Sequence, residues 1–140
     1  MVRILDDAMN NTSVILLFEI GNQALLFPGD AQIENWMYTL DNKDLMKRLA
    51  NVTLYKVGHH GSRNATPKSL WSTFVHRDKA GAKGRLKSVM STMTGVYGKL
   101  AEGTEVPRGS LVKELRAQSD LYTTQDIKGK ALKAKIELPL

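Results

Sequence analysis

Two short polar stretches of this 140-residue chain follow apolar runs and hold the side chains best suited to chemistry. The first is Pro28-Gly29-Asp30, and the second is Gly58-His59-His60-Gly61. Carboxylate and imidazole together form the ligand set that zinc, manganese and iron take in proteins. Flanking glycines permit positive φ and close backbone approach, which a fixed ligand geometry needs. The pattern therefore predicts a metal site that uses Asp30 and one or both of the neighbouring histidines.

Both stretches also have a purely structural interpretation. Asp30 could be the N-cap of a helix that begins at Ala31, and of the two histidines one could pack inside while the other points to water. Directly after them, a group of hydroxyl, guanidinium and amide donors provides a suitable lining for a phosphate or carboxylate. These donors are Ser62, Arg63, Asn64 and Thr66.

The elements that must position these residues alternate between strands and helices, which predicts an α/β class. Apolar runs over residues 13–19 and 23–27 flank a Gly-Asn turn and predict a β-hairpin, whose strands are apolar on both faces and so favour burial on both sides. Helical spacing follows over residues 31–40 and 44–50, and a third buried strand is predicted over 52–57. The remaining predictions are helices at 68–75 and 110–118, and strands at 86–92, 121–125 and 131–138.

Composition limits the function further. The chain has no cysteine, so a thiolate nucleophile, a disulfide and an iron–sulfur cluster are excluded. Its longest apolar runs are far shorter than the roughly 20 residues that a membrane helix needs, and its N-terminus has no signal-peptide pattern, so we expect a cytoplasmic protein without membrane contact. The net charge of +6 is uneven, because residues 51–140 carry sixteen basic and seven acidic side chains. That excess could attract nucleic acid or an acidic partner, although a solvated lysine-rich surface explains it as well.

The two motifs and their surroundings resemble the metallo-β-lactamase fold superfamily. The matching segments are Asn11-Thr12-Ser13 before an apolar run, Leu26-Phe27-Pro28-Gly29-Asp30-Ala31, and Leu54-Tyr55-Lys56-Val57-Gly58-His59-His60-Gly61-Ser62. They are most similar to the metallo-hydrolase domain of bacterial competence (DNA-uptake) proteins, in which one strand ends in Thr-Gly-Asp and a later one in His-His-Gly-Ser.

The resemblance implies a two-metal hydrolase. Asp30 would bridge two divalent ions, with zinc expected and manganese or iron as alternatives, and His59 or His60 would be a ligand of the second ion. Asp30 and His60 would be the catalytic residues, and Ser62, Arg63 and Asn64 would bind the substrate. The implied reaction is attack by a metal-bound hydroxide on a phosphodiester or similar ester, with nucleic acid as one candidate substrate.

The chain departs from the family in one important respect. The family's first metal motif, His-x-His-x-Asp-His, precedes a strand of this kind, and this chain contains no His-x-His. A late His-Pro of the family's relatives is replaced here by Glu105-Val106-Pro107. We therefore expect residues 1–140 to form a single partial domain, the C-terminal half of an αββα sandwich, with a mixed sheet and helices on one face. Such a half would leave a sheet face open to pair with another copy or another domain, and by itself would have little activity. The alternative is a basic binding module without catalysis.

Overall fold

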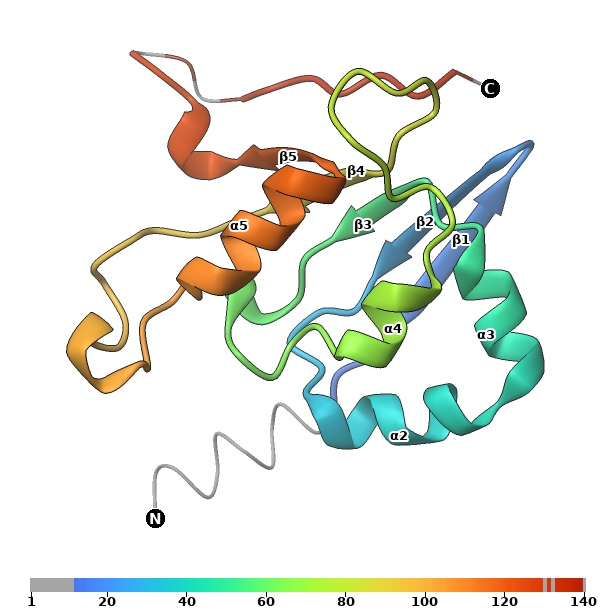
Figure 1. Ribbon diagram of the computed structural model, residues 1–140, viewed down its shortest axis with the longest axis horizontal. Helices are drawn as coiled ribbons and strands as arrows, with labels where there is room; N and C mark the ends of the chain where they lie inside the picture. The colour runs from blue at the N-terminus through green and yellow to red at the C-terminus, as the bar shows by residue number, and fades with distance from the viewer. Residues whose placement is uncertain (1–11, 130, 132, 140) are drawn as a thin grey trace.

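A five-stranded mixed sheet forms the centre of the computed structural model, which describes residues 12–129, 131 and 133–139 (Figure 1). The strands lie in chain order, and β1 pairs antiparallel with β2, while β2, β3, β4 and β5 are mutually parallel. Their bounds are β1 Leu16–Ile20, β2 Gln23–Phe27, β3 Leu54–Lys56, β4 Lys87–Met90 and β5 Asp120–Thr123. The α/β class and the mixed sheet are confirmed.

Helices connect the parallel strands, and polar side chains cap the first two of them. Gln32 and Asn35 form a reciprocal capping box at the start of α2, and the Asn42 side chain accepts hydrogen bonds from the amides of Asp44 and Leu45 at the start of α3. Asp30 is therefore not the N-cap of this helix. The helices are α2 Ile33–Asp41, α3 Lys43–Ala50, α4 Lys68–Thr73 and α5 Gly109–Gln118, with short 3₁₀ turns at His59–Gly61, Leu100–Glu102 and Thr124–Asp126.

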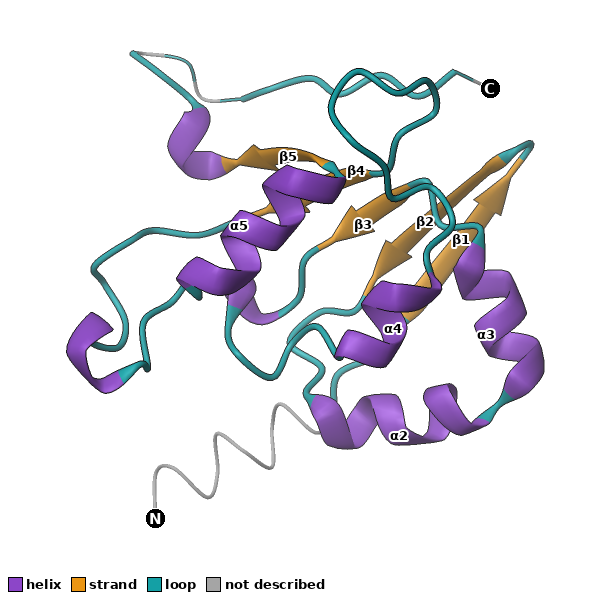
Figure 2. Ribbon diagram, in the orientation of Figure 1, coloured by secondary structure: helices purple, strands orange, loops and turns teal. Residues whose placement is uncertain are grey.

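The helices cover one face of the sheet, and the core lies between the two layers. Figure 2 shows α4 and α5 in front of the sheet, with α2 and α3 following on the same side. Strand residues that point toward this layer are fully buried, among them Leu26, Tyr55 and Met90. Trp36 and Trp71 are also buried in the core, as their place on the apolar faces of their helices predicts.

The opposite face of the sheet carries exposed apolar side chains. β1 is an edge strand, and Leu16, Phe18 and Ile20 on its outward side are each about half exposed, at 46%, 48% and 53%. Phe18 packs edge-on against Phe27 of β2, with ring centroids 5.8 Å apart. The expectation that both hairpin strands are buried on both faces is therefore wrong for β1, because within the described residues the helical layer covers only one side.

One further expectation is corrected at the C-terminal end of the chain, and one at the N-terminal end lies outside the described residues. The described residues among 131–138 form no strand, and this tail is joined to the sheet by a hydrogen bond from Gln23 Nε2 to the carbonyl of Pro139 at 2.6 Å. Asn11, the first residue of the quoted motif, lies outside the described residues. No helix in the described part of the chain is long and apolar enough to cross a membrane.

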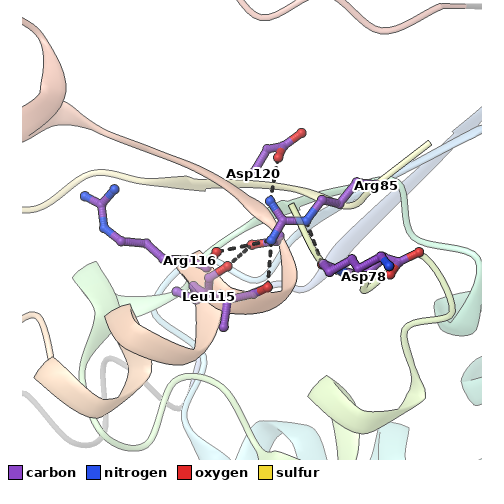
Figure 3. Close-up of polar contacts among 8 residues, drawn as sticks. Asp78, Arg85, Leu115, Arg116 and Asp120 are labelled. Carbon is purple, nitrogen blue, oxygen red and sulfur yellow. Dashed lines mark hydrogen bonds and ion pairs between the residues drawn. The ribbon is translucent and has the colours of Figure 1, made fainter. Parts of the chain in front are cut away.

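A buried arginine fixes α5 to the sheet (Figure 3). The Arg85 side chain is only 5% exposed; its Nη1 pairs with Asp120 Oδ1 at 2.7 Å, and its Nε donates to the carbonyl of Asp78 at 2.6 Å. Its Nη2 donates to the carbonyls of Arg116 and Ala117 at 3.1 and 2.8 Å. These carbonyls belong to the last turn of α5 and have no acceptor role inside the helix, so the guanidinium supplies the missing donors and a favourable charge.

Candidate functional site

The two predicted motifs meet at one rim of the sheet. Parallel strands β2 and β3 end at the same edge (Figure 1), and Asp30 and His59 each lie three residues beyond the end of their strand. The amide of His59 donates to the carbonyl of Gly29 at 3.1 Å, so the two loops are joined by a direct backbone hydrogen bond. In open α/β sheets, ligands bind beyond the carboxyl ends of the strands, which is the location of this rim.

The backbone of the two histidines is strained. His59 and His60 have φ values of 40° and 54°, in the left-handed region that residues other than glycine seldom occupy. Each such residue costs on the order of 1 kcal/mol and persists where the surroundings hold it, which is most often at a functional site. Here the amide of Ser62 donates to the carbonyl of His59 at 2.9 Å, and the amide of Arg108 donates to the carbonyl of Gly61 at 2.9 Å.

The glycines on either side of the pair have the close contacts that the sequence predicts. A Cβ on Gly61, where φ is +82°, would lie 2.5 Å from Met90 Sδ and 3.0 Å from Pro107 Cβ. A Cβ on Gly58 would lie 3.2 Å from the carbonyl oxygen of Gly29. Gly61 is needed for both its conformation and its close approach, whereas Gly58, with φ of −70°, is needed for close approach alone.

The ring of His60 has a defined orientation. Its Nδ1 lies 2.9 Å from the carbonyl oxygen of Ser91, which follows β4. Because a carbonyl only accepts, Nδ1 must carry the proton, and in the neutral ring Nε2 then keeps its lone pair. A histidine that donates one nitrogen to a backbone carbonyl is the arrangement typical of a metal ligand. His60 lines a hollow of about 260 Å³ together with Ser91, Thr92, Met93, Tyr97, Val106 and Thr124.

His59 differs from His60 in its surroundings. Its Nδ1 is buried and has no hydrogen-bond partner among the described residues, and the same holds for the hydroxyl of Ser62. Unpartnered buried polar atoms are rare in folded proteins and each calls for a missing partner. The two orphans lie in the same turn, so the loop has unused hydrogen-bonding capacity beside the rim.

The Asp30 carboxylate interacts electrostatically with the ammonium group of Lys56. Burial lowers the pKa of the Lys56 ammonium group below its usual value, and the negative charge of Asp30 opposes that shift. Lys56 is the last residue of β3 and lies on the face opposite the helices, because its sheet neighbour Tyr55 points into the core. Sequence analysis did not single out Lys56, although a lysine inside an otherwise apolar strand was a signal for it.

A buried tyrosine supports the histidine loop from below. The hydroxyl of Tyr55 lies 2.8 Å from Thr66 Oγ1, and the two groups tie the end of the loop to β3. Burial raises the pKa of the Tyr55 phenol to about 12, while the hydrogen bonds with Thr66 and with the backbone of Gly58 oppose that rise. The Thr66 hydroxyl is thus used in the hydrogen bond with Tyr55, and the N-cap of α4 is the next residue, Pro67.

The described residues do not fit a complete two-metal centre. No three His, Asp or Glu side chains in the part of the chain that the structure describes are grouped so that they could hold an ion. Glu105, where the resemblance would call for a late His-Pro, accepts hydrogen bonds from Arg108 Nη1 at 2.9 Å and from the amide of Gly109 at 3.3 Å. Val106 lines the hollow beside His60 instead. Within the described residues, Asp30 and a histidine alone would be too few ligands for such a centre.

The predicted substrate-binding residues Ser62, Arg63 and Asn64 do not all lie at one site. Arg63 and Asn64 line a separate cavity beside α4 and α5, while His60 lines the smaller hollow beyond β4 and β5. Ser62, which lies between His60 and Arg63 in the sequence, has a buried hydroxyl. Comparison of the chain with protein-family models, curated proteins and solved structures finds no match. The likeness to metallo-β-lactamase-fold proteins therefore stays a prediction from the motifs.

Proposed function

We propose that this chain is one half of a metal-dependent hydrolase domain of the metallo-β-lactamase fold. Asp30 and His60 would contribute ligands to a site that a second segment completes, and the substrate would be a phosphodiester or a similar ester. The observation that carries the proposal is the backbone hydrogen bond between His59 and Gly29, which holds the two ligand-bearing loops together at the carboxyl edge of the sheet.

His60 is the better candidate for the ligand. Its Nδ1 is occupied by the carbonyl of Ser91, so its Nε2 is left with a lone pair, and the residue is exposed at the rim. The Nδ1 of His59 is buried. The left-handed backbone at both positions supports a functional role, since a loop selected for stability alone would favour glycine or asparagine there.

The open face of the sheet supports a partner in the form of a second half-domain. Exposed apolar residues such as Phe18 lie on this face. Lys56, which interacts electrostatically with Asp30, lies on the same face next to the rim. A second layer laid over this face would cover the apolar residues and end beside the incomplete ligand set. One partner would then both cover the exposed apolar residues and complete the ligand set.

The proposal is tested by titrating the purified, chelator-washed chain with Zn²⁺ and Co²⁺ in a calorimeter. The chain by itself is expected to bind one ion with a dissociation constant weaker than about 1 µM, because two ligands from the protein leave the coordination shell open. Asp30→Asn and His60→Gln are each expected to weaken binding by at least roughly tenfold. The matched controls are Asp41→Asn and His76→Gln, which change the same residue types away from the rim.

Equal affinities for Asp30→Asn and Asp41→Asn would refute the assignment of Asp30. Tight stoichiometric binding of two ions by the chain alone would refute its description as a half-site. Urea unfolding of each variant serves as the check on folding.

The second candidate function is a binding module without catalysis, and the lack of a three-ligand group in the described residues favours it. Residues 51–140 supply the basic charge that such a module would use. It predicts that the metal-free chain binds single-stranded oligonucleotides with an affinity that falls steeply as salt rises, unchanged by Asp30→Asn.

A further inference from the structure

A cavity lies on the helical side of the molecule, beside α4 and α5. It has a volume of about 680 Å³, within the range of sites for small organic ligands. It lies between the loop that follows the histidines, α4 and the first turns of α5, and it is open to solvent on one side. The residues that define its chemistry are Arg63, Lys68, Arg108, Trp71, Leu111 and Glu114.

The charge of the lining is predominantly positive. Three cations, Arg63, Lys68 and Arg108, face a single carboxylate, that of Glu114. Arg108 is already paired with Glu105 Oε2 at 2.9 Å. Arg63 and Lys68 are exposed and have no hydrogen bond or ion pair with any residue that the structure describes, so two cationic groups at this cavity lack a counter-charge from the protein.

Part of the cavity lining is apolar, and the polar groups next to it already have partners. Glu114 accepts a hydrogen bond from Trp71 Nε1 at 3.1 Å and another from Gln118, so its carboxylate is already bonded by neutral donors. The indole of Trp71 is further held by the guanidinium of Arg77, 5.5 Å from the ring centroid. Trp71 and Leu111 thus give the cavity an apolar surface beside the unpaired cations, with Lys68 and Trp71 one turn apart on α4.

We infer that this cavity binds a small organic phosphate of about mononucleotide size, with its phosphate at Arg63 and Lys68 and its organic part against Trp71 and Leu111. A phosphomonoester carries between one and two negative charges at neutral pH, which matches two unpaired cations better than a single carboxylate does. The inference does not rest on the proposed hydrolase function, because this cavity and the hollow that contains His60 have no lining residue in common.

Calorimetric titration of the full chain with adenosine monophosphate, inorganic phosphate and adenosine tests the inference. The monophosphate is expected to bind at least roughly tenfold more tightly than either adenosine or inorganic phosphate, because only it can use both the cations and the apolar surface. An Arg63→Gln, Lys68→Gln double variant is expected to lose at least about tenfold in affinity for the monophosphate. Lys113→Gln, an exposed lysine of α5 outside the cavity, is the matched control and should bind as the unchanged chain does.

Three results would overturn the inference. The first is equal binding of adenosine and its monophosphate, and the second is an equal loss of affinity for the double variant and for Lys113→Gln. The third is an oligonucleotide that binds far more tightly than the mononucleotide, with a steep salt dependence, since that would assign the cations to a nucleic-acid surface. Matching urea midpoints for the variants establish that the losses arise in binding and not in folding, and Leu111→Ala, which removes part of the apolar surface, provides a second test that leaves the charge unchanged.

Discussion

Replacing Arg85 by methionine tests the account of how α5 is held against the sheet. The substitution keeps a long apolar stem and removes the guanidinium, so four acceptors lose their donor: the carboxylate of Asp120 and the carbonyls of Asp78, Arg116 and Ala117. A hydrogen bond with a charged group contributes about 1.5–3 kcal/mol net, and breaking a buried ion pair costs about 3–5 kcal/mol.

The expected loss is smaller than the sum of these terms. The Asp120 side chain is 41% exposed and is rehydrated when its partner is removed. We therefore expect Arg85→Met to lower the free energy of unfolding by about 3 kcal/mol. Arg85→Lys should lose about 2 kcal/mol, because a single ammonium cannot reach acceptors that surround a planar guanidinium.

The measurement is urea unfolding followed by tryptophan fluorescence, since both tryptophans are buried in the core. With an m-value of about 2 kcal/mol/M, the midpoint of Arg85→Met should fall by about 1.5 M. Arg48→Met is the matched control, because Arg48 pairs with Glu19 while both side chains are about half exposed. If Arg85→Met lowers the midpoint no more than Arg48→Met does, the buried guanidinium is not what fastens α5.

Two further predictions concern the support of the histidine loop. In urea unfolding, Gly61→Ala should lower the free energy of unfolding by about 1–2 kcal/mol more than Gly81→Ala does. The two glycines have nearly the same φ (+82° and +84°), but of the two only Gly61 has other atoms within 4 Å of the new Cβ. Equal losses for the two variants would show that the site at Gly61 is not crowded. Burial raises the pKa of Tyr55 from 10 to about 12, so this tyrosine loses its proton at lower pH in the unfolded chain than in the folded chain. The free energy of unfolding should therefore be unaffected by Tyr55 below pH 10 and should fall as pH rises toward 12, by about 2–3 kcal/mol in total. Tyr55→Phe should lack this alkaline loss, and parallel pH profiles of the two proteins would refute it.

Local signals in the sequence were sufficient for most elements. The Gly-Asn turn between two β-rich runs, the helical spacing of apolar residues and the alternation of strands with helices predicted an α/β chain, and the structure confirms it. The glycines around the histidine pair predicted close backbone contacts, which Gly61 has with Met90 and Pro107. Each of these signals depends on neighbours within a few residues, so a linear sequence contains them.

The sequence could not predict features that depend on distant partners. β1 was expected to be buried on both faces, but burial is decided by which layers lie over a strand, and the helices cover one face only. The buried Arg85 was missed because its acceptors are in α5 and β5, more than thirty residues away along the chain apart from Asp78.

The candidate site divides in the same way. The residue types, a carboxylate after one strand and two imidazoles after the next, are properties of the sequence, and so is the expectation that parallel strands bring them to one edge. The tertiary structure decided which histidine ring is oriented by a backbone carbonyl, and it placed Arg63 and His60 in the linings of different cavities. The reason is that a few residues of loop can turn neighbouring side chains in opposite directions, and only contacts with remote segments, here the Ser91 carbonyl for His60, select one of them.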